Sequence, residues 1–448
     1  MTGQLELPLL ARGETSEPGR SDEAPKTAHD SKRSGASSLM EAVVDRDNLK
    51  AALKRVKRNG GSPGIDGMSV QELPDYLRQN WGALREQLLA GSYRPQPVLR
   101  RQIPKSDGGV RELGIPTVLD RFIQQALLQV LQPQFDPTFS DHSYGFRPGR
   151  RAHDAVRRAQ RYIEEGRRWV VDVDLEKFFD RVHHDTLMGV LSQRIADRRV
   201  LRLIRRYLEA GVMAGGVVME RWEGTPQGGP LSPLLANVLL DRVDQALERR
   251  GHAFVRYADD CNVYVRSRRA GERAMALLGR LYEGLHLRIN GAKSATAPAW
   301  LRPFLGFAFW AGPNRSIKRR VADQALRKMK QRVRELTRRN AGRSLAQIAK
   351  RLGEYLAGWK AYFRLAETPR TFSDLDGWIR HRLRAIQLKQ WKRGRTIFRE
   401  LRARGASPDL AARVAGNCHS WWRNSAMGLH IALPTRLFDE LGVPRLGA

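Results

Sequence analysis

The chain has 448 residues, which is long for a single domain and leaves room for large hydrophobic cores. Its 79 Lys and Arg residues outnumber 47 Asp and Glu residues, and the formal net charge of +32 favours a polyanion, above all nucleic acid, as the partner. No apolar run is long enough to span a membrane, and two distant cysteines exclude both a disulfide framework and a zinc site of the usual spacing.

The first 40 residues are rich in Gly, Ser, Pro, Glu and Arg, with few large apolar residues after Leu10, so we expect a disordered tail. They include no basic stretch followed by an apolar core, the pattern of a secretion signal, which favours a cytoplasmic location. Apolar spacing then predicts helices over 43–59 and 69–89, with a turn-rich segment at 62–67 between them.

Residues 98–117 predict a β-hairpin, because two apolar runs flank an Asp-Gly-Gly turn. Lys105 and Arg111 flank this turn and could clamp a phosphate chain from one face. From these residues alone, two solvated surface cations are the commoner explanation. Helices are expected next, over 120–131 and 152–164.

Residues 169–175 read as a strand of strong β formers, Trp-Val-Val-Asp-Val-Asp-Leu. Because side chains alternate along a strand, Asp172 and Asp174 share a face. Acidic side chains inside an apolar strand are costly unless they are paired or bind a metal. The strand therefore favours a metal site.

Two helices are expected over 184–195 and 198–210, and a Gly- and Pro-rich loop at 223–230 then enters a helix over 231–249. Such a loop can bring backbone N–H groups close to an anionic ligand. Many loop–helix junctions share this pattern, so the loop alone does not identify a site.

Residues 254–265 predict a second hairpin, with the adjacent acids Asp259 and Asp260 at its turn. Two carboxylates held together repel each other unless a cation joins them, and Mg²⁺ prefers such oxygen ligands. By itself, an Asp-Asp pair is most often an ordinary polar turn. Together with the acidic strand at 169–175, the pair favours a metal site instead.

A helix is expected over 271–282, with short strands over 285–290 and 304–309. From residue 316 onward, 30 Lys and Arg residues face 10 Asp and Glu residues, the electrostatic footprint of a protein that binds a phosphate backbone. Long helices are expected over 323–339, 345–363 and 375–392.

The order of these motifs resembles one family over about residues 40–448, the reverse transcriptase/maturase encoded by bacterial group II introns. The motifs that carry the resemblance are SPGIDG at 62–67, the Lys105/Arg111 hairpin, YGFRP at 144–148, Asp174 to Asp180, TPQGGPLSP at 225–233, YADD at 257–260, Lys293-Ser294 and FLGF at 304–307. Each motif is moderately specific, and their common order and spacing are very specific. The stretches 358–363 and 375–384 resemble the family's maturase (thumb) domain, and 421–423 its short C-terminal part.

The resemblance implies an α+β fold: a right-hand polymerase, with fingers and an antiparallel palm sheet, followed by an α-helical thumb/maturase domain. The implied division is a disordered tail (1–40), fingers and palm (41–312), the thumb/maturase domain (313–392) and a short basic nucleic-acid-binding segment (393–448). No Cys/His-rich endonuclease module follows the thumb, so the chain resembles the endonuclease-lacking lineage, which would prime from a nascent strand or an existing end.

By the same resemblance, Asp174, Asp259 and Asp260 would be catalytic and would hold two Mg²⁺ ions, with help from the backbone carbonyl of Leu175. Asp172 and Asp180 fall outside the family's ligand positions, so we assign them structural roles. The nucleotide-binding residues would be Lys105, Arg111, Phe179, Gln227 and Lys293, with the Phe179 ring excluding a 2′-hydroxyl and so selecting dNTPs. Phe304, Leu305, Gly306 and Phe307 would support the primer end.

The implied function is an RNA-directed DNA polymerase that also binds its parent group II intron RNA as a splicing maturase and supports retrohoming by target-primed cDNA synthesis in the bacterial cytoplasm. The partners would be the intron RNA, an RNA template and a DNA primer or target, without a membrane, and both monomer and dimer stay open. Candidates for RNA contacts are Arg327, Lys328, Lys330, Arg334, Arg380, Arg382 and Arg384. Two other functions stay open: a splicing cofactor without polymerase activity, and a domesticated reverse transcriptase of phage defence or a CRISPR system.

Overall fold

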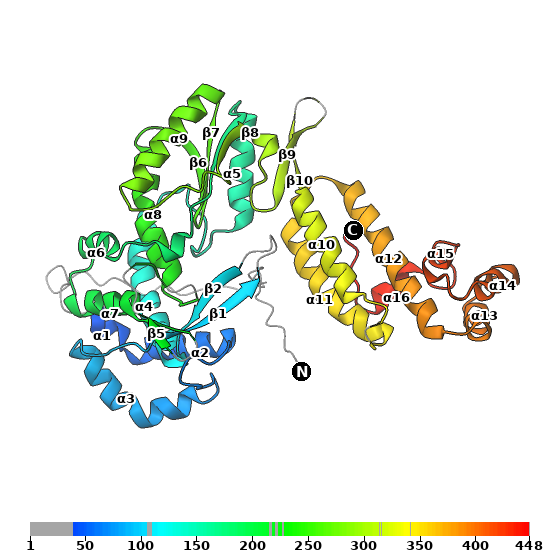
Figure 1. Cartoon of the computed structure of the whole chain (residues 1–448), viewed down its shortest axis with the longest axis horizontal. Helices are drawn as coiled ribbons and strands as arrows, with labels where there is room; N and C mark the ends of the chain where they lie inside the picture. Colours follow the sequence, from blue (N-terminus) through cyan, green and yellow to red (C-terminus); the bar gives the residue numbers. More distant parts are fainter. Residues whose placement is uncertain are drawn as a thin grey trace, which may run out of the picture. The chain divides into compact units, whose positions relative to one another are not determined.

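The computed structural model of the protein describes residues 39–104, 110–214, 217–219, 223–225, 228–312, 314, 316–340 and 342–447. For Arg111, Ala214 and residues 217–219 it describes the backbone alone. Contacts divide the chain into two units, which we call the N-terminal unit (Glu23–Arg302) and the C-terminal unit (containing Pro303–Ala448). Figure 1 shows helices and mixed sheets in the first of these units, and mainly helices in the second.

A four-stranded antiparallel sheet, in the order β6-β7-β3-β8, organises the N-terminal unit. Its strands are β3 (Trp169–Val173), β6 (Ala253–Tyr257), β7 (Asp260–Val265) and β8 (Ala295–Pro298). Helices α8 (Ser232–Glu248) and α9 (Arg268–Glu283) lie on one side of the sheet and α5 (Ala152–Glu164) on the other (Figure 1). The α9 contact is close because Gly271 has no side chain: a Cβ there would lie 2.4 Å from Cγ2 of Thr296 in β8.

Successive side chains along each strand lie on opposite sides of the sheet. In β3 and β7 the pair Val171–Val263 faces α9, and so does Val265. The alternate residues face α5, whose Tyr162 ring lies 5.8 Å from that of Tyr264. The side of the sheet that carries α5 is therefore also the side of Asp172.

A second sheet, in the order β2-β1-β4-β5, contains β1 (Val98–Pro104), β2 (Val110–Ile115), β4 (Val212–Ala214) and β5 (Val217–Met219). The expected hairpin at 98–117 is confirmed, with β1 and β2 antiparallel and Pro104 opposite Val110. The β4–β5 pair was not expected from the sequence.

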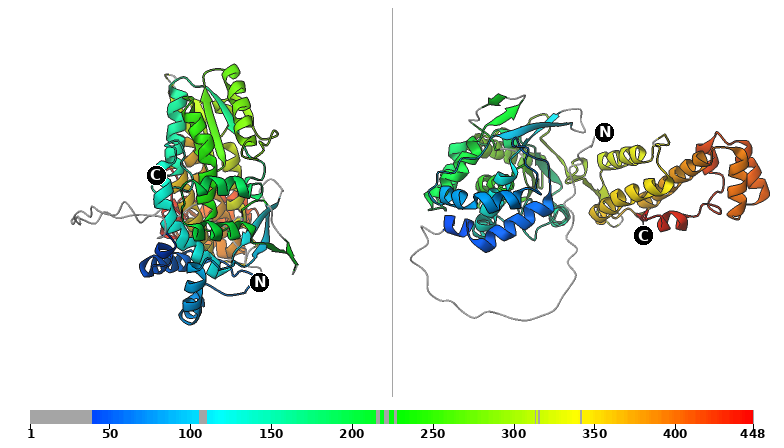
Figure 2. Two further views of the ribbon diagram at one scale, coloured as in Figure 1. Left: turned by 90° about the vertical axis from the view of Figure 1, so that its left-hand side faces the viewer. Right: turned by 90° about the horizontal axis from the view of Figure 1, so that it is seen from below.

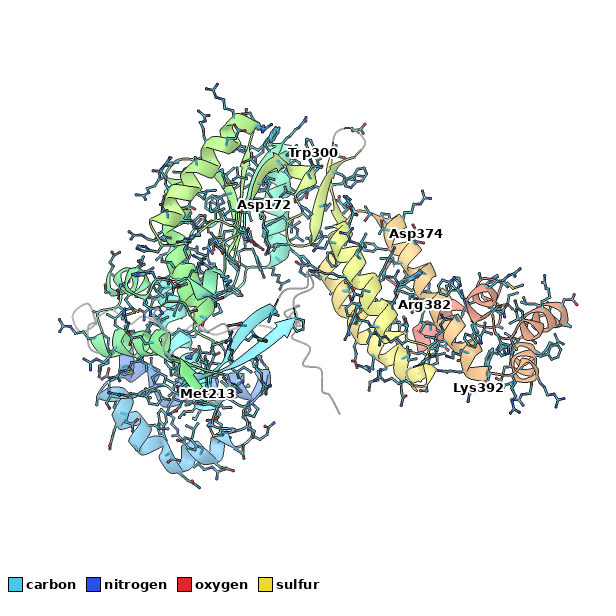
Figure 3. All side chains as sticks on the ribbon, in the orientation of Figure 1. Asp172, Met213, Trp300, Asp374, Arg382 and Lys392 are labelled. Carbon is cyan, nitrogen blue, oxygen red and sulfur yellow. The ribbon has the colours of Figure 1, made fainter. Side chains whose placement is uncertain are left out.

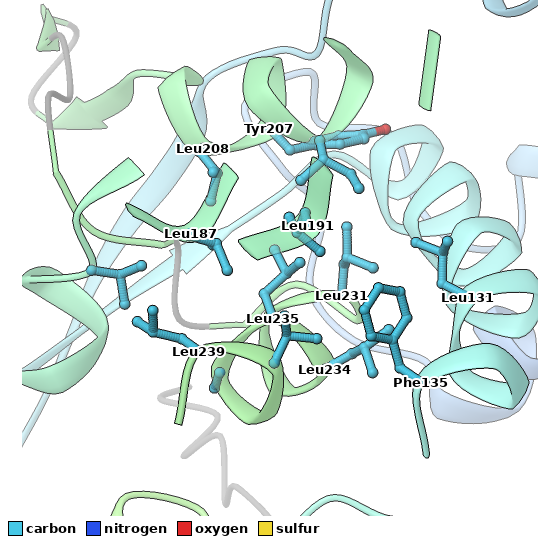
Figure 4. Close-up of a cluster of buried hydrophobic side chains, with 14 of the residues drawn as sticks. Leu131, Phe135, Leu187, Leu191, Tyr207, Leu208, Leu231, Leu234, Leu235 and Leu239 are labelled. Carbon is cyan, nitrogen blue, oxygen red and sulfur yellow. The ribbon is translucent and has the colours of Figure 1, made fainter. Parts of the chain in front are cut away.

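The remaining helices of this unit share one hydrophobic core. They are α1 (Leu39–Val43), α2 (Arg46–Asn59), α3 (Leu73–Leu89), α4 (Val118–Phe135), α6 (His184–Ser192) and α7 (Arg198–Glu209), with short 3₁₀ turns at Asp136–Thr138, Phe178–Asp180 and Ala299–Leu301. Figure 4 shows the centre of this core, where Phe135, Leu191, Leu208 and Leu235 come from four different helices. Burial of these side chains is the main favourable term that holds α4 and α6–α8 together.

The C-terminal unit contains a two-stranded sheet and then helices. Its elements are β9 (Phe307–Ala311), β10 (Ile317–Val321), α10 (Asp323–Leu336), α11 (Leu345–Phe363), α12 (Pro369–Trp391), α13 (Gly394–Ala403), α14 (Pro408–Gly416), α15 (Trp421–Ser425) and α16 (Thr435–Glu440). Helices α13–α15 gather at the end of α12, around a small core of their own (Figure 2).

The α+β fold with an antiparallel sheet and a helical C-terminal part is confirmed. The expected tail falls outside the described residues, except that Leu39 and the fully buried Met40 begin α1. The expected strand at 285–290 is absent: the segment is a turn with a single bridge from Ile289 to Leu175. In the described part of the chain, no helix is long and apolar enough to cross a membrane.

Candidate functional site

The two adjacent acids lie where β6 turns into β7. Ala258 and Asp259 form the two-residue loop, and Asp260 is the first residue of β7. The loop is tight, and Ala258 has a left-handed backbone with φ of 59°. A rigid hairpin therefore presents both carboxylates at the end of the sheet.

The third acid comes from the neighbouring strand. Val173 at the end of β3 pairs with Cys261 of β7, so the next step of the register brings Asp174 opposite Asp260. Alternation puts both side chains on the sheet side that also carries Asp172. The expectation that Asp172 and Asp174 share a face is confirmed.

The neighbouring acids act electrostatically on Asp260. Partial burial, followed by the negative charges of Asp259, Asp172 and Asp174, raises the pKa of Asp260 to about 7. More than a third of Asp260 is open to solvent, so water screens part of this effect, and the direction of the shift is what matters. The site has an excess of negative charge that the positive charge of Lys293 only partly offsets.

The carboxylate of Asp172 is held by an arginine. This carboxylate accepts a hydrogen bond of 2.8 Å from Nε of Arg302, and Nη2 of Arg302 lies 2.7 Å away. Figure 3 labels Asp172 in the sheet. Arg302 also donates to the backbone carbonyl of Lys293. Burial raises the pKa of Asp172, and Arg302 opposes that shift. The structural role expected for Asp172 is consistent with this pair.

The donor set suits a hard divalent cation. Carboxylate oxygens with an excess of negative charge are what Mg²⁺ binds, and such an ion would offset the negative charges that, after burial, raise the pKa of Asp260. Among the described residues, no three Asp, Glu, His or Cys side chains are close enough to hold an ion as they stand. Asp174 and Asp260 are both partly open to solvent, which leaves their carboxylates room to turn toward a shared ion.

Other residues fix the strand end around Asp174. Its backbone N–H donates to Oγ of Ser294 at 3.0 Å, and its carbonyl accepts from the N–H of Asn290 at 2.8 Å. Leu175 is buried and bridges to Ile289. Lys293 lies in the turn between Asn290 and Ser294, and its Nζ lies 3.9 Å from Oδ2 of Asp174.

The reverse side of the acidic turn holds residues that the sequence analysis missed. Arg256 is fully buried, and its guanidinium donates to Asp244 of α8, to Asn237 of α8 and to the carbonyl of Ala258. An arginine between apolar neighbours in a strand was the available signal, because a buried charge requires a partner. The sequence alone does not reveal which acid of α8 faces it.

Two of the expected nucleotide-binding residues, Phe179 and Lys293, are described together with their side chains. Phe179 is partly buried, its ring contacts that of Phe178 edge-to-face at 5.1 Å, and its carbonyl accepts the N–H of Thr225 at 2.6 Å. Arg111 lies in β2 opposite Ile103. Lys105, Gln227 and the side chain of Arg111 lie outside what the structure describes.

The FLGF stretch forms a tight turn in the C-terminal unit. Phe304 and Phe307 exchange two backbone hydrogen bonds of 2.8 and 2.9 Å around Leu305 and Gly306, which both have positive φ. Tyr362 of α11 donates its hydroxyl to the carbonyl of Leu305 at 2.9 Å, so the turn is fixed to the helices of its own unit.

Among the residues expected to contact RNA, Arg380 has a structural role instead. It is 2% exposed and lies between the carboxylates of Asp376 and Asp439, at 2.9 and 3.2 Å. A phosphate cannot reach a guanidinium enclosed in this way. Arg384 is half-buried and donates to the carbonyl of Leu433. Four other candidates for RNA contacts are exposed: Arg327, Lys328, Lys330 and Arg334.

Arg382 belongs to a surface on α10, the turn after it, α12 and α15, which we call the cation–aromatic surface. Its residues are Arg334, Arg339, Trp378, Arg382, Lys389 and Trp421 (Figure 3 labels Arg382). Arg334 and Arg382 lie 5.7 and 5.4 Å from the ring centre of Trp378. Partial burial, followed by the positive charges of Arg334 and Arg339, lowers the pKa of Arg382. Like charges crowd here, and a bound anion would relieve them.

Comparisons with known proteins find two family matches along the chain. Residues 103–309 match the family described as reverse transcriptase (RNA-dependent DNA polymerase), and residues 326–405 match the maturase-specific domain of group II introns. Protein YkfC of Escherichia coli K12 is 38% identical over 218 residues, 47% of this chain and 57% of that protein. The group II intron-encoded protein LtrA of Lactococcus lactis is 41% identical over 181 residues, 40% of this chain and 29% of that protein.

Each of these alignments thus spans less than two thirds of the relative's own length. A chain of the solved partial Cas6-RT-Cas1–Cas2 complex is 24% identical, with a TM-score of 0.36 over 55% of this chain and 42% of that chain. With a reverse transcriptase domain followed by a group II intron maturase domain, the chain belongs to the group II intron reverse transcriptase/maturase family.

Proposed function

We propose that the chain is an RNA-directed DNA polymerase whose catalytic residues are Asp174, Asp259 and Asp260. The observation that carries the proposal is the placement of Asp174 opposite Asp260, at strand ends on one side of the sheet, beside the Asp259 turn. Burial of Asp260, followed by the negative charges of Asp259, Asp172 and Asp174, raises its pKa, and this concentration of negative charge supports a site for divalent cations.

Two Mg²⁺ ions held by these carboxylates and the Leu175 carbonyl would lower the pKa of a primer 3′-hydroxyl and stabilise the leaving pyrophosphate. Residues around the acids would bind and orient the nucleotide. Lys293 adds a positive charge 3.9 Å from Asp174, suited to a triphosphate oxygen. Phe179 limits the space at the sugar, and Lys105, Arg111 and Gln227 complete the proposed nucleotide site.

Primer extension on an RNA template with dNTPs and Mg²⁺ tests the polymerase proposal. We expect cDNA from the wild type and at least about a thousandfold less from Asp259→Ala, because removing a metal ligand removes both metal functions. Asp172→Asn is the matched control, since that carboxylate is already paired with Arg302, and it should keep activity within a few fold. An inactive wild type, or equal loss in both variants, would contradict the proposal.

The proposed template is the parent group II intron RNA, which the C-terminal unit would bind as a maturase. The cation–aromatic surface supports this part of the proposal, because crowded guanidinium groups over indole rings suit phosphates and bases together. Retrohoming by target-primed cDNA synthesis would then combine both units: one holds the intron RNA and the other copies it.

The RNA-binding part has its own test. Arg334→Ala/Arg339→Ala should weaken binding of the intron RNA and reduce the slope of log affinity against log salt by about two. Arg268→Ala/Arg273→Ala removes the same charge from exposed positions of α9 and is the control. Equal loss in both double variants would show that net charge, and not this surface, binds the RNA.

Splicing separates the maturase role from the polymerase role. The protein should lower the Mg²⁺ concentration at which its intron RNA splices, and Asp259→Ala should retain this effect while losing cDNA synthesis. A wild type that assists splicing but makes no cDNA would instead favour the splicing-cofactor function. Splicing rates that are unchanged by the protein would remove the maturase part.

A further inference from the structure

We propose that Arg256 is a positioning residue for the acidic turn: held by Asp244 and Asn237, its buried guanidinium fixes the Ala258 carbonyl, and thereby sets where Asp259 and Asp260 stand relative to Asp174. The inference rests on the proposed function, because it assigns the turn a catalytic geometry to maintain.

The guanidinium makes a closed set of contacts. Nε lies 2.9 Å from both carboxylate oxygens of Asp244, and Nη2 lies 2.6 Å from Oδ2. Nη1 donates to Oδ1 of Asn237 and to the carbonyl of Ala258, both at 2.9 Å. One planar group therefore joins helix α8 to the residue just before Asp259.

The location of Arg256 makes this link specific to the turn. Arg256 pairs with Cys261 across the hairpin, so its side chain faces α8 and α9, on the opposite side of the sheet from Asp260. It cannot touch a nucleotide or a metal there. Its effect on the reaction has to pass through the Ala258 carbonyl, which belongs to the strained part of the loop with φ of 59°.

The loop around Gly145 also contacts the turn, and Asn237 links this loop to Arg256. Nδ2 of Asn237 donates to the carbonyl of Gly145 at 2.9 Å, and the loop around Gly145 pairs with Arg256 through two backbone hydrogen bonds of 2.9 Å. A Cβ on Gly145 would lie 2.2 Å from the backbone nitrogen of Ala258. The turn is thus enclosed between this loop and the guanidinium, and Arg256 contacts both.

Stability alone does not require an ion pair at this place. Asp244 and Arg256 are both fully buried, and burial lowers the pKa of Arg256 while Asp244 more than offsets this and raises it, so the arginine stays charged. Replacing such a pair by apolar residues of similar volume is often neutral or stabilising, whereas breaking it is not. What apolar residues cannot provide is the hydrogen bond to Ala258.

An apolar pair that preserves stability but lacks the hydrogen bond to Ala258 can therefore test the positioning role. Asp244→Leu/Arg256→Met removes both charges and should keep the melting temperature of the wild type within a few degrees. Its kcat for primer extension should fall by roughly 10- to 100-fold, because misplacement of catalytic groups by about 1 Å costs that much, while KM for dNTP changes little. Mn²⁺ binding, measured by electron paramagnetic resonance without nucleotide, should weaken several fold.

Arg256→Lys covers the case in which the double variant does not fold. It keeps the charge beside Asp244 but lacks the planar fork that reaches Ala258, so it should show the same losses in kcat and Mn²⁺ affinity. The control is Arg268→Met/Glu272→Leu, an exposed ion pair of α9. Folded variants with wild-type kcat and Mn²⁺ affinity overturn the inference. A wild type that makes no cDNA refutes the proposed function instead, and Mn²⁺ affinity then still tests the positioning role.

Discussion

Gly145 lies so close to Ala258 that a Cβ on Gly145 would come within 2.2 Å of the Ala258 backbone nitrogen. Ser143, two residues earlier, pairs with the β6 edge at Arg256, so the loop runs along the hairpin as a short extra strand. The glycine is required by this close approach and not by its own backbone angles. The position of the Asp259–Asp260 turn therefore depends on this loop as well as on its own sequence.

Gly145→Ala should displace the turn and reduce both activity and stability. Since the neighbouring atoms are backbone and cannot rotate away, we expect a loss of about 1–3 kcal/mol in the free energy of unfolding. We also expect at least about a tenfold loss of kcat, because the Asp259 and Asp260 carboxylates move with the turn. Urea unfolding and primer extension measure the two effects.

Gly279→Ala is the control, because it makes the same change in helix α9 where a Cβ would meet nothing within 4 Å. It should be neutral or stabilise the protein by up to about 1 kcal/mol, since alanine favours a helix interior over glycine. Loss of activity in this variant, or wild-type behaviour of Gly145→Ala, would contradict the assignment of the loop.

Arg380→Ala should destabilise the protein through lost pairing and not through lost RNA binding. The substitution leaves the carboxylates of Asp376 and Asp439 without their buried partner, and the carbonyls of Val443 and Pro444 without a donor. Breaking a buried pair in this way costs about 3–5 kcal/mol. Chemical denaturation should show this loss, while Arg327→Ala, at an exposed site of α10, should stay within about 0.5 kcal/mol of the wild type.

The buried contacts of Arg380 could not be predicted from the sequence. A basic residue in a basic helix predicts an RNA contact, and only the fold brings Asp439 and the 443–444 carbonyls, about sixty residues further along, around it. The Arg256–Asp244 pair was missed for the same reason, because it depends on how helix α8 packs on β6. Contacts between distant segments carry no local signal.

Local patterns were read more successfully. The shared face of Asp172 and Asp174 follows from the two-residue period of a strand, and helices over 152–164 and 345–363 have the expected bounds. Alternating apolar residues at 285–290 predicted a strand, but His286 takes a positive φ and the chain turns. The edge strand β8, Ala295–Pro298, has no β-rich composition and forms because β3 offers it a free edge.

Asp241 predicts a pH dependence of stability. Burial, and then the charge of Asp244, raises the pKa of Asp241 to about 6 from its usual 3.8. The stability that this group contributes is therefore fully present below pH 3.8 and is lost as the pH rises through 6, because the folded state disfavours the ionised carboxylate. Asp241→Asn should melt at a higher temperature than the wild type at pH 8, and the difference should shrink toward pH 4.

The substitution is well matched, since an asparagine oxygen can still accept the Ser140 N–H that Asp241 accepts at 3.1 Å. Asp75→Asn, on the exposed face of α3, makes the same change and is the control for the loss of one carboxylate. A constant difference between Asp241→Asn and the wild type from pH 4 to 8 would show that the carboxyl is not perturbed.

Phe179 should decide between deoxyribonucleotides and ribonucleotides. In the proposed site its ring lies against the sugar, so Phe179→Val opens space for a 2′-hydroxyl and should raise the ratio of rNTP to dNTP incorporation, measured as kcat/KM, by about tenfold or more. The backbone contact from the Thr225 N–H to the Phe179 carbonyl does not involve the side chain, so the substitution leaves the loop in place. An unchanged ratio in a folded, active variant would place Phe179 away from the sugar and leave its ring with the packing role against Phe178 alone.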